Sequence, residues 1–173
     1  IAVEEIREGA SYDGARAILQ AVIGTARIKI QVDVGFGDVV TPAAAEECMP
    51  AMLDQEPATV LAYPRETVVA EKLEIIVQLG LINSRMKDYF DLHALAASFQ
   101  FDGAVLVDAV SNTFDRRGTS LPVAVPTGLS DEFATDSMKV AQWAAFLRRI
   151  GRDDASSLAD CVADLRHFAM PVF

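Results

Sequence analysis

Cysteine, histidine and tryptophan are scarce in this chain of 173 residues, which has two cysteines, two histidines and one tryptophan. Cys48 and Cys161 are far apart in the sequence, and neither has a second thiol near it. This spacing excludes a disulfide framework and a cysteine-based zinc site. We therefore expect both cysteines to be reduced, small apolar residues of a cytoplasmic protein.

The chain also lacks long apolar runs and an excess of positive charge. No apolar run approaches the roughly 20 residues that span a membrane, and the acidic N-terminus differs from a signal peptide. The net charge is −10, from 25 acidic and 15 basic residues. Such a balance argues against avid, sequence-independent binding to nucleic acid, but it permits a local basic groove.

The first third of the chain has the pattern of β-strands. In residues 26–38, the apolar residues Ile28, Ile30, Val32 and Val34 alternate with polar residues, which predicts a half-buried strand. The break between this segment and the apolar run before it predicts an antiparallel hairpin. We expect further strands at residues 1–8, 15–23 and 58–64.

From Pro64 onward the apolar residues recur with helical spacing. The first expected helix, residues 64–80, begins with proline and ends with glycine, as helices commonly do. Further helices are expected at residues 84–99, 102–118, 130–151 and 156–169, with a loop at 120–129. The predicted fold class is therefore α+β, with a small mixed or antiparallel sheet in residues 1–62 and a helical domain in residues 63–173.

Two neighbouring helices carry charge on their predicted inward faces. At about 100° per residue, Lys72 lies at the centre of the apolar face of the first helix. In the second helix, for which Ser84 is the expected N-cap, Asp88 lies on the inward face between Asp91 and Arg85. These charges predict either a buried ion-pair network between the helices or a cleft that binds a polyanion.

Three segments resemble a known family when they are taken in order: "IQVDVGFGD", "AYPRETVVAEKLEIIVQLG" and "NSRMKDYFDLHAL". They are similar to the AbiEii/AbiGii nucleotidyltransferase toxins of the DNA polymerase β-like superfamily, and the resemblance extends over nearly the whole chain. It implies nucleotide transfer from an NTP with Mg²⁺, in some relatives to tRNA. It also implies a toxin of a bacterial toxin–antitoxin or abortive-infection system, with a cognate antitoxin as partner.

The resemblance also implies roles for individual residues. The lysine of the family's third motif falls on Lys72, and the acid of the fourth motif falls on Asp88. Lys72, Asp88 and Asp91 are accordingly the expected catalytic residues, with Asp88 as a general base or as the group that orients Lys72. Lys72, Arg85 and Lys87 are the expected nucleotide-binding residues.

Asp33 is the expected metal ligand. It lies on the polar face of the strand before "GFG", and the resemblance places the superfamily's third-strand carboxylate there. The family's Gly-Gly/Ser turn and Asp-x-Asp motif, which should precede Asp33, are missing. We therefore expect the chain to be the C-terminal portion of a longer protein and inactive by itself. The alternative function is a non-catalytic module that binds a protein partner such as an antitoxin.

Overall fold

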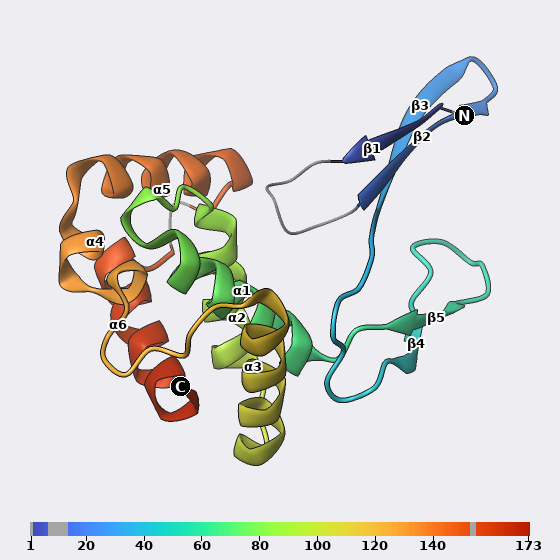
Figure 1. Ribbon diagram of the computed structural model, residues 1–173. Coiled ribbons are helices and arrows are strands. Elements are labelled where there is room, and N and C mark those ends of the chain that lie inside the picture. Colours follow the sequence, from blue (N-terminus) through green and yellow to red (C-terminus); the bar gives the residue numbers. More distant parts are fainter. Residues whose placement is uncertain (1, 7–13, 153–154) are drawn as a thin grey trace. The chain divides into compact units, whose positions relative to one another are not determined.

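The chain forms two compact units, residues Ile1–Asp38 and Val39–Phe173 (Figure 1). The computed structural model describes residues 2–6, 14–152 and 155–173. Residues 7 and 8 of the first expected strand therefore lie outside the described residues. Both units contain antiparallel strands, and the second also contains the helices, so the predicted α+β class is confirmed.

The first unit is a three-stranded antiparallel sheet in the order β1-β2-β3. Its strands are β1 (Ala2–Ile6), β2 (Gly14–Ile23) and β3 (Ala26–Gly35). Gly24 follows β2 with a positive φ of 59°, a conformation that glycine adopts without a steric penalty. A glycine at the first position of a two-residue turn matches the twist of the flanking strands. The predicted hairpin is thereby confirmed.

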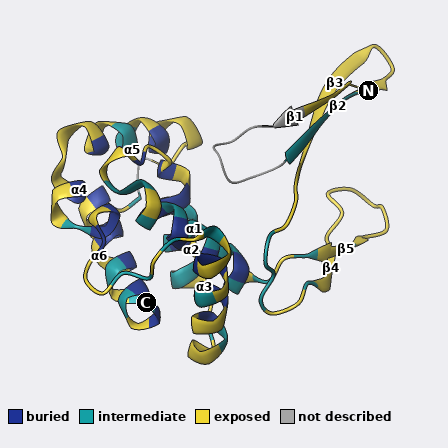
Figure 2. Cartoon of the chain, in the orientation of Figure 1, coloured by how far each residue is buried: buried dark blue, intermediate teal, exposed yellow. Residues whose placement is uncertain are grey.

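The predicted burial of β3 is wrong. Ile28, Ile30, Val32 and Val34 do share one face, but their exposed fractions lie between 42 and 45%. The described part of this unit consists of strands alone, so it contains no helix that could cover the face. The alternation correctly indicated the pleat of the strand, but burial also requires a second layer (Figure 2).

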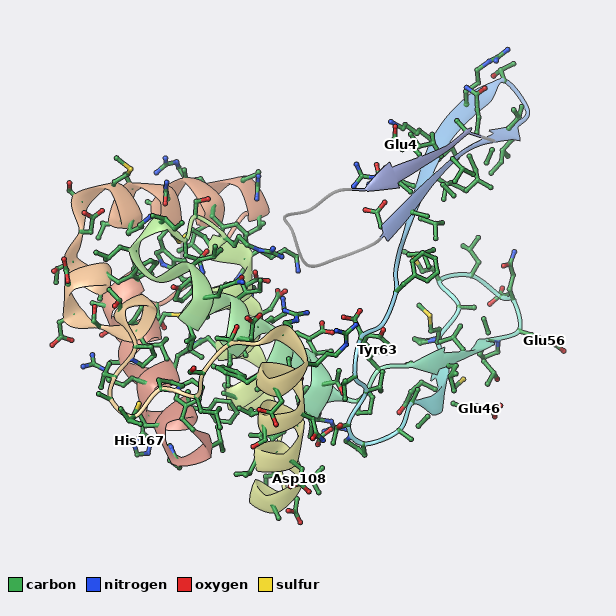
Figure 3. The ribbon with its side chains drawn as sticks, viewed as in Figure 1. Glu4, Glu46, Glu56, Tyr63, Asp108 and His167 are labelled. Carbon is green, nitrogen blue, oxygen red and sulfur yellow. The ribbon has the colours of Figure 1, made fainter. Side chains whose placement is uncertain are left out.

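The second unit begins with a β-hairpin of two strands, β4 (Ala45–Met49) and β5 (Ala58–Ala62). Only β5 was expected from the sequence. Both strands are short and largely exposed, and Glu46 of β4 and Glu56 of the connecting loop are exposed and extend away from the strands (Figure 3). A short strand with two consecutive glutamates has little apolar alternation to reveal it.

Six α-helices follow the hairpin in the described residues. They are α1 (Arg65–Leu79), α2 (Met86–Ser98), α3 (Gly103–Arg117), α4 (Asp131–Thr135), α5 (Ser137–Ile150) and α6 (Leu158–Ala169). Three short 3₁₀ turns accompany them: η1 (Gly80–Ile82), η2 (Thr127–Leu129) and η3 (Met170–Val172). None of the described helices is long and apolar enough to cross a membrane.

The helix expected at residues 130–151 is interrupted at Asp136. Its carboxylate accepts the backbone N–H of Lys139 at 2.9 Å and caps the start of α5. Ser130 caps α4 in the same way through the N–H of Phe133. An aspartate that competes for backbone donors ends one helix and begins the next, so the single expected helix is two.

The core of the second unit lies among the helices, where the buried residues are concentrated (Figure 2). The rings of Tyr89 and Phe133 stack with centroids 5.0 Å apart, and the Tyr89 hydroxyl donates to the Gly128 carbonyl at 2.9 Å. A Cβ on Gly128 would lie 2.5 Å from the Ile76 carbonyl oxygen. Only glycine therefore allows η2 to pack this closely against α1.

Candidate functional site

An ion-pair cluster joins α1 to α2. The ammonium nitrogen of Lys72 lies 2.6 Å from Asp88 Oδ1 and 3.0 Å from Asp91 Oδ2. These are charge-assisted hydrogen bonds between adjacent helices. The structure thus brings together the lysine and the two aspartates that the sequence placed on neighbouring helices.

Two further cations complete this cluster from α2 and the residue before it. Arg85 Nε donates to Asp88 Oδ2 at 2.7 Å, and the Lys87 ammonium donates to Asp91 Oδ2. These pairs follow the helical spacings of three and four residues at which side chains meet. We call the five residues Lys72, Arg85, Lys87, Asp88 and Asp91 the Lys72 cluster. Each of its carboxylates lies between two cations.

The Lys72 cluster extends from the protein interior to solvent. The side chain of Asp88 is only 8% exposed and that of Lys72 is 18% exposed, whereas Arg85 is 53% and Lys87 is 70% exposed. The inner pair is therefore shielded from water, and the outer cations can reach a ligand.

The pKa values of the inner groups reflect their partners. Burial by itself lowers the pKa of Lys72, but the hydrogen bonds with Asp88 and Asp91 outweigh it, so the net pKa is raised. Burial by itself raises the pKa of Asp91, and the bonds from Lys87 and Lys72 reverse this, so its net pKa is lowered. Lys72 is consequently an ammonium and Asp91 a carboxylate at neutral pH.

The predicted position of Lys72 at the centre of the buried face of α1 is wrong. The fully buried residues of α1 include Val69, Leu73 and Ile76, and Lys72 lies at the edge of this set. Glu74 of the same helix has no exposed surface. The reason is α3, which packs against α1 on the side of Leu73 and Glu74 and turns that side into the interior.

The predicted inward position of Asp88 in α2 is confirmed, but the face around it differs. Its neighbour Tyr89 is completely buried, whereas Phe99 is 44% exposed. Phe99 is the C-cap of α2 and lies beyond its last turn. Asp88 is therefore at the edge of the buried face, where a carboxylate meets both core residues and exposed cations.

The sequence did not reveal how the start of α2 is held. The helix begins at Met86, and its N-cap is Arg85 rather than the expected Ser84, with no side-chain capping hydrogen bond. Instead, the side-chain oxygen of buried Asn83 accepts the backbone N–H of Arg85 at 2.8 Å. The buried ammonium of Lys139 donates to the Asn83 carbonyl at 2.8 Å. Asparagine two residues before an N-cap is a recognisable turn signal, but nothing in the sequence indicated Lys139.

Asp33 lies in the first unit and is engaged by Arg16. The two residues are directly opposite each other in the β2–β3 register, and the guanidinium donates to both carboxylate oxygens at 2.7 and 2.9 Å. The hydrogen bond from Arg16 lowers the pKa of Asp33, and that from Gln31 acts in the same direction. The carboxylate is thus ionised at neutral pH and already paired.

The described residues do not fit a Mg²⁺ site. Among them, no group of three or more histidine, cysteine, aspartate or glutamate side chains is arranged to hold a metal ion. A magnesium site needs free carboxylate oxygens, whereas Asp33, Asp88 and Asp91 are each bound by arginine or lysine. A metal at Asp33 or Asp88 would have to displace a cation, because both oxygens of each carboxylate accept from arginine or lysine.

A comparison of the sequence with known protein families found one match. A family model described as "Nucleotidyl transferase AbiEii toxin, Type IV TA system" matches residues 1–167, nearly the whole chain. The match includes all five residues of the Lys72 cluster and Asp33. No curated protein matches the chain.

Proposed function

This chain belongs to the AbiEii family of nucleotidyl transferase toxins, and we propose that Lys72 binds the phosphates of the nucleotide that is transferred. The family's type IV toxin–antitoxin description implies a nucleotide substrate and an antitoxin partner. The observation that carries the proposal is a protonated, partly exposed lysine held between two carboxylates. Such a group presents positive charge at a constant position.

The hydrogen-bonding capacity of Lys72 supports this role. An ammonium group has three N–H donors, and in the described part of the chain Asp88 and Asp91 accept from Lys72. One donor therefore remains for a phosphate oxygen. Because the two aspartates restrain the other donors, the direction of the third is set before a nucleotide arrives.

The geometry of Asp88 favours an orienting role over that of a general base. Its two carboxylate oxygens accept from Lys72 and Arg85, and its side chain is only 8% exposed. A general base has to reach the proton that it removes, and both oxygens of Asp88 already have a cationic partner. Asp91 accepts from both Lys72 and Lys87 through a single oxygen, Oδ2.

Arg85 and Lys87 are proposed to bind phosphate at the outer end of the Lys72 cluster. Both cations are exposed, and each forms an ion pair with an aspartate of α2. A guanidinium pairs well with phosphate oxygens, and an ammonium acts as a point charge beside it. tRNA as acceptor remains a prediction from the family resemblance, and so does Mg²⁺, which at Asp33 would have to displace Arg16.

Nucleotide binding and transfer test the proposal directly. Lys72→Ala should weaken NTP binding by about tenfold or more, because a hydrogen bond between charged groups contributes about 1.5–3 kcal/mol. Calorimetric titration with NTPs measures binding, and incorporation of labelled NTP into total tRNA measures transfer. Lys29→Ala is the matched control, since it removes an exposed lysine from β3.

Two results would refute the proposed nucleotide-binding role of Lys72. Equal loss in K72A and K29A would show a general effect of charge and would refute the assignment of Lys72. A K72A protein that melts several degrees lower but binds NTP like the wild type would show that Lys72 is only a structural ion-pair partner. Melting curves of both variants are therefore part of the experiment.

A further inference from the structure

A groove of about 560 Å³ lies between the N-terminal end of α2 and the helix α5. Residues 84–88 line one wall, and Gln142, Phe146 and Arg149 are among the residues of α5 that line the other. Lys72 is not among the lining residues. The groove therefore reaches Arg85, Lys87 and Asp88 of the Lys72 cluster without including the lysine that is proposed to bind the nucleotide.

Positive charge is concentrated around this groove, in contrast to the net charge of −10 of the whole chain. Its cations are Arg85, Lys87 and Arg149, and its one acidic lining residue, Asp88, is already bound by Lys72 and Arg85. A cleft lined by one sign of charge attracts ligands of the opposite sign even on a protein of like net charge. The groove thus fits an anion.

Arg149 lines the groove but does not belong to the Lys72 cluster. It is exposed, and its guanidinium lies 5.6 Å from the centre of the Phe146 ring. In the described residues it forms no salt bridge with a carboxylate. The ring supports the guanidinium, and its N–H donors have no hydrogen-bond partner among the residues that the structure describes, which leaves them for a phosphate group.

Gln142 adds an unsatisfied polar group to the same wall. Its amide oxygen is inaccessible to water and has no hydrogen-bond partner within the part of the chain that the structure describes. A buried acceptor without a partner is costly, and the side chain that carries it lines the groove. Phosphate and hydroxyl groups occur side by side along a ribose-phosphate backbone.

We propose that this α2–α5 groove binds the phosphodiester backbone of an RNA acceptor, with Arg149 as a phosphate ligand. The inference rests on the proposed function, in which Lys72 holds the NTP at the inner end of the cluster. The acceptor has to reach that NTP, and the groove meets the Lys72 cluster at Arg85 and Lys87 on its exposed side. Cations on both walls suit successive phosphates of a chain better than one compact triphosphate.

The test compares two adjacent arginines of α5. Arg149→Gln removes the groove cation, and Arg148→Gln removes the same charge from an exposed residue that does not line the groove. Affinities of the purified protein for a single-stranded RNA oligonucleotide and for tRNA are measured at several salt concentrations. R149Q should weaken RNA binding roughly 3- to 10-fold and reduce the salt slope by about one unit, while R148Q leaves both unchanged.

NTP affinity distinguishes this inference from the proposed function. R149Q should leave NTP binding unchanged, whereas K72A weakens it. If R149Q weakens RNA binding while K72A has no effect on NTP binding, the groove assignment stands and the proposed function fails. If NTP binding depends on Lys72 but R149Q binds RNA like the wild type, only the groove assignment fails.

Three other results overturn the groove assignment. They are equal effects of R149Q and R148Q, a loss of NTP binding rather than RNA binding in R149Q, and no measurable RNA binding by the wild-type protein. Circular dichroism spectra of both variants show whether α5 is still folded. Because both arginines are exposed, we expect neither substitution to change the melting temperature.

Discussion

Removal of Arg117 should destabilise the protein far more than removal of other paired arginines. Arg117 Nη1 donates to Glu74 Oε2 at 2.8 Å, and the side chain of Glu74 has no exposed surface. The Thr119 hydroxyl donates to the other oxygen of this carboxylate at 2.5 Å. Arg117→Met would leave a buried carboxylate with one neutral donor as its remaining close partner.

The expected cost follows from this burial. Breaking a buried ion pair by removing one partner costs about 3–5 kcal/mol, because the remaining charge cannot return to water. For a chain of this size that corresponds to a fall in melting temperature of roughly 6–20 °C. Arg166→Met is the matched control, since Arg166 pairs with Asp131, whose side chain is 82% exposed. Exposed pairs contribute at most about 1 kcal/mol.

Urea unfolding followed by circular dichroism measures both variants. A double variant that combines Glu74→Gln with Arg117→Met removes both charges and should recover part of the stability lost in R117M. If R117M is no less stable than R166M, or if the double variant is less stable than R117M, the buried pair does not have the energetic role assigned to it.

Two further predictions concern packing and pH. Gly128→Ala should cost about 1–3 kcal/mol of unfolding free energy, because the added Cβ would meet the Ile76 carbonyl oxygen at 2.5 Å; an unchanged melting temperature would refute this close approach. The pKa of Asp91 is lowered in the folded protein, so its contribution to stability is present above its unfolded pKa and is lost as the pH falls through the folded value. Asp91→Asn should therefore be less stable than the wild type at pH 7, and urea unfolding should show this difference shrinking at pH 3; a difference that is the same at both pH values would contradict the ion pairing.

Local features of the sequence were enough to predict most of the elements. The hairpin of β2 and β3 follows from alternation around a glycine turn, and α1, α2, α3 and α6 follow from helical spacing bounded by proline, glycine and capping residues. The junction of α4 and α5 was missed, because an internal capping aspartate has no effect on apolar spacing. The strand β4 was missed because its exposed residues need no alternation.

The sequence contains enough information to predict the pairing of Lys72 with Asp88 and Asp91. Opposite charges at unusual positions of two consecutive helices have to be compensated, and helices adjacent in the chain are commonly adjacent in space. The motifs of the family resemblance fall on the same residues, and the family is confirmed by the match to residues 1–167.

Which side of each helix is buried was decided by the tertiary structure. A wheel gives angles between side chains, but the direction of the interior depends on what packs against the helix, and α3 placed Glu74 rather than Lys72 inside. The exposure of the apolar face of β3 has the same origin, since alternation describes the strand and only a covering layer buries it. The contact of Lys139 with Asn83 spans 56 residues, and no local pattern specifies an interaction at that distance along the chain.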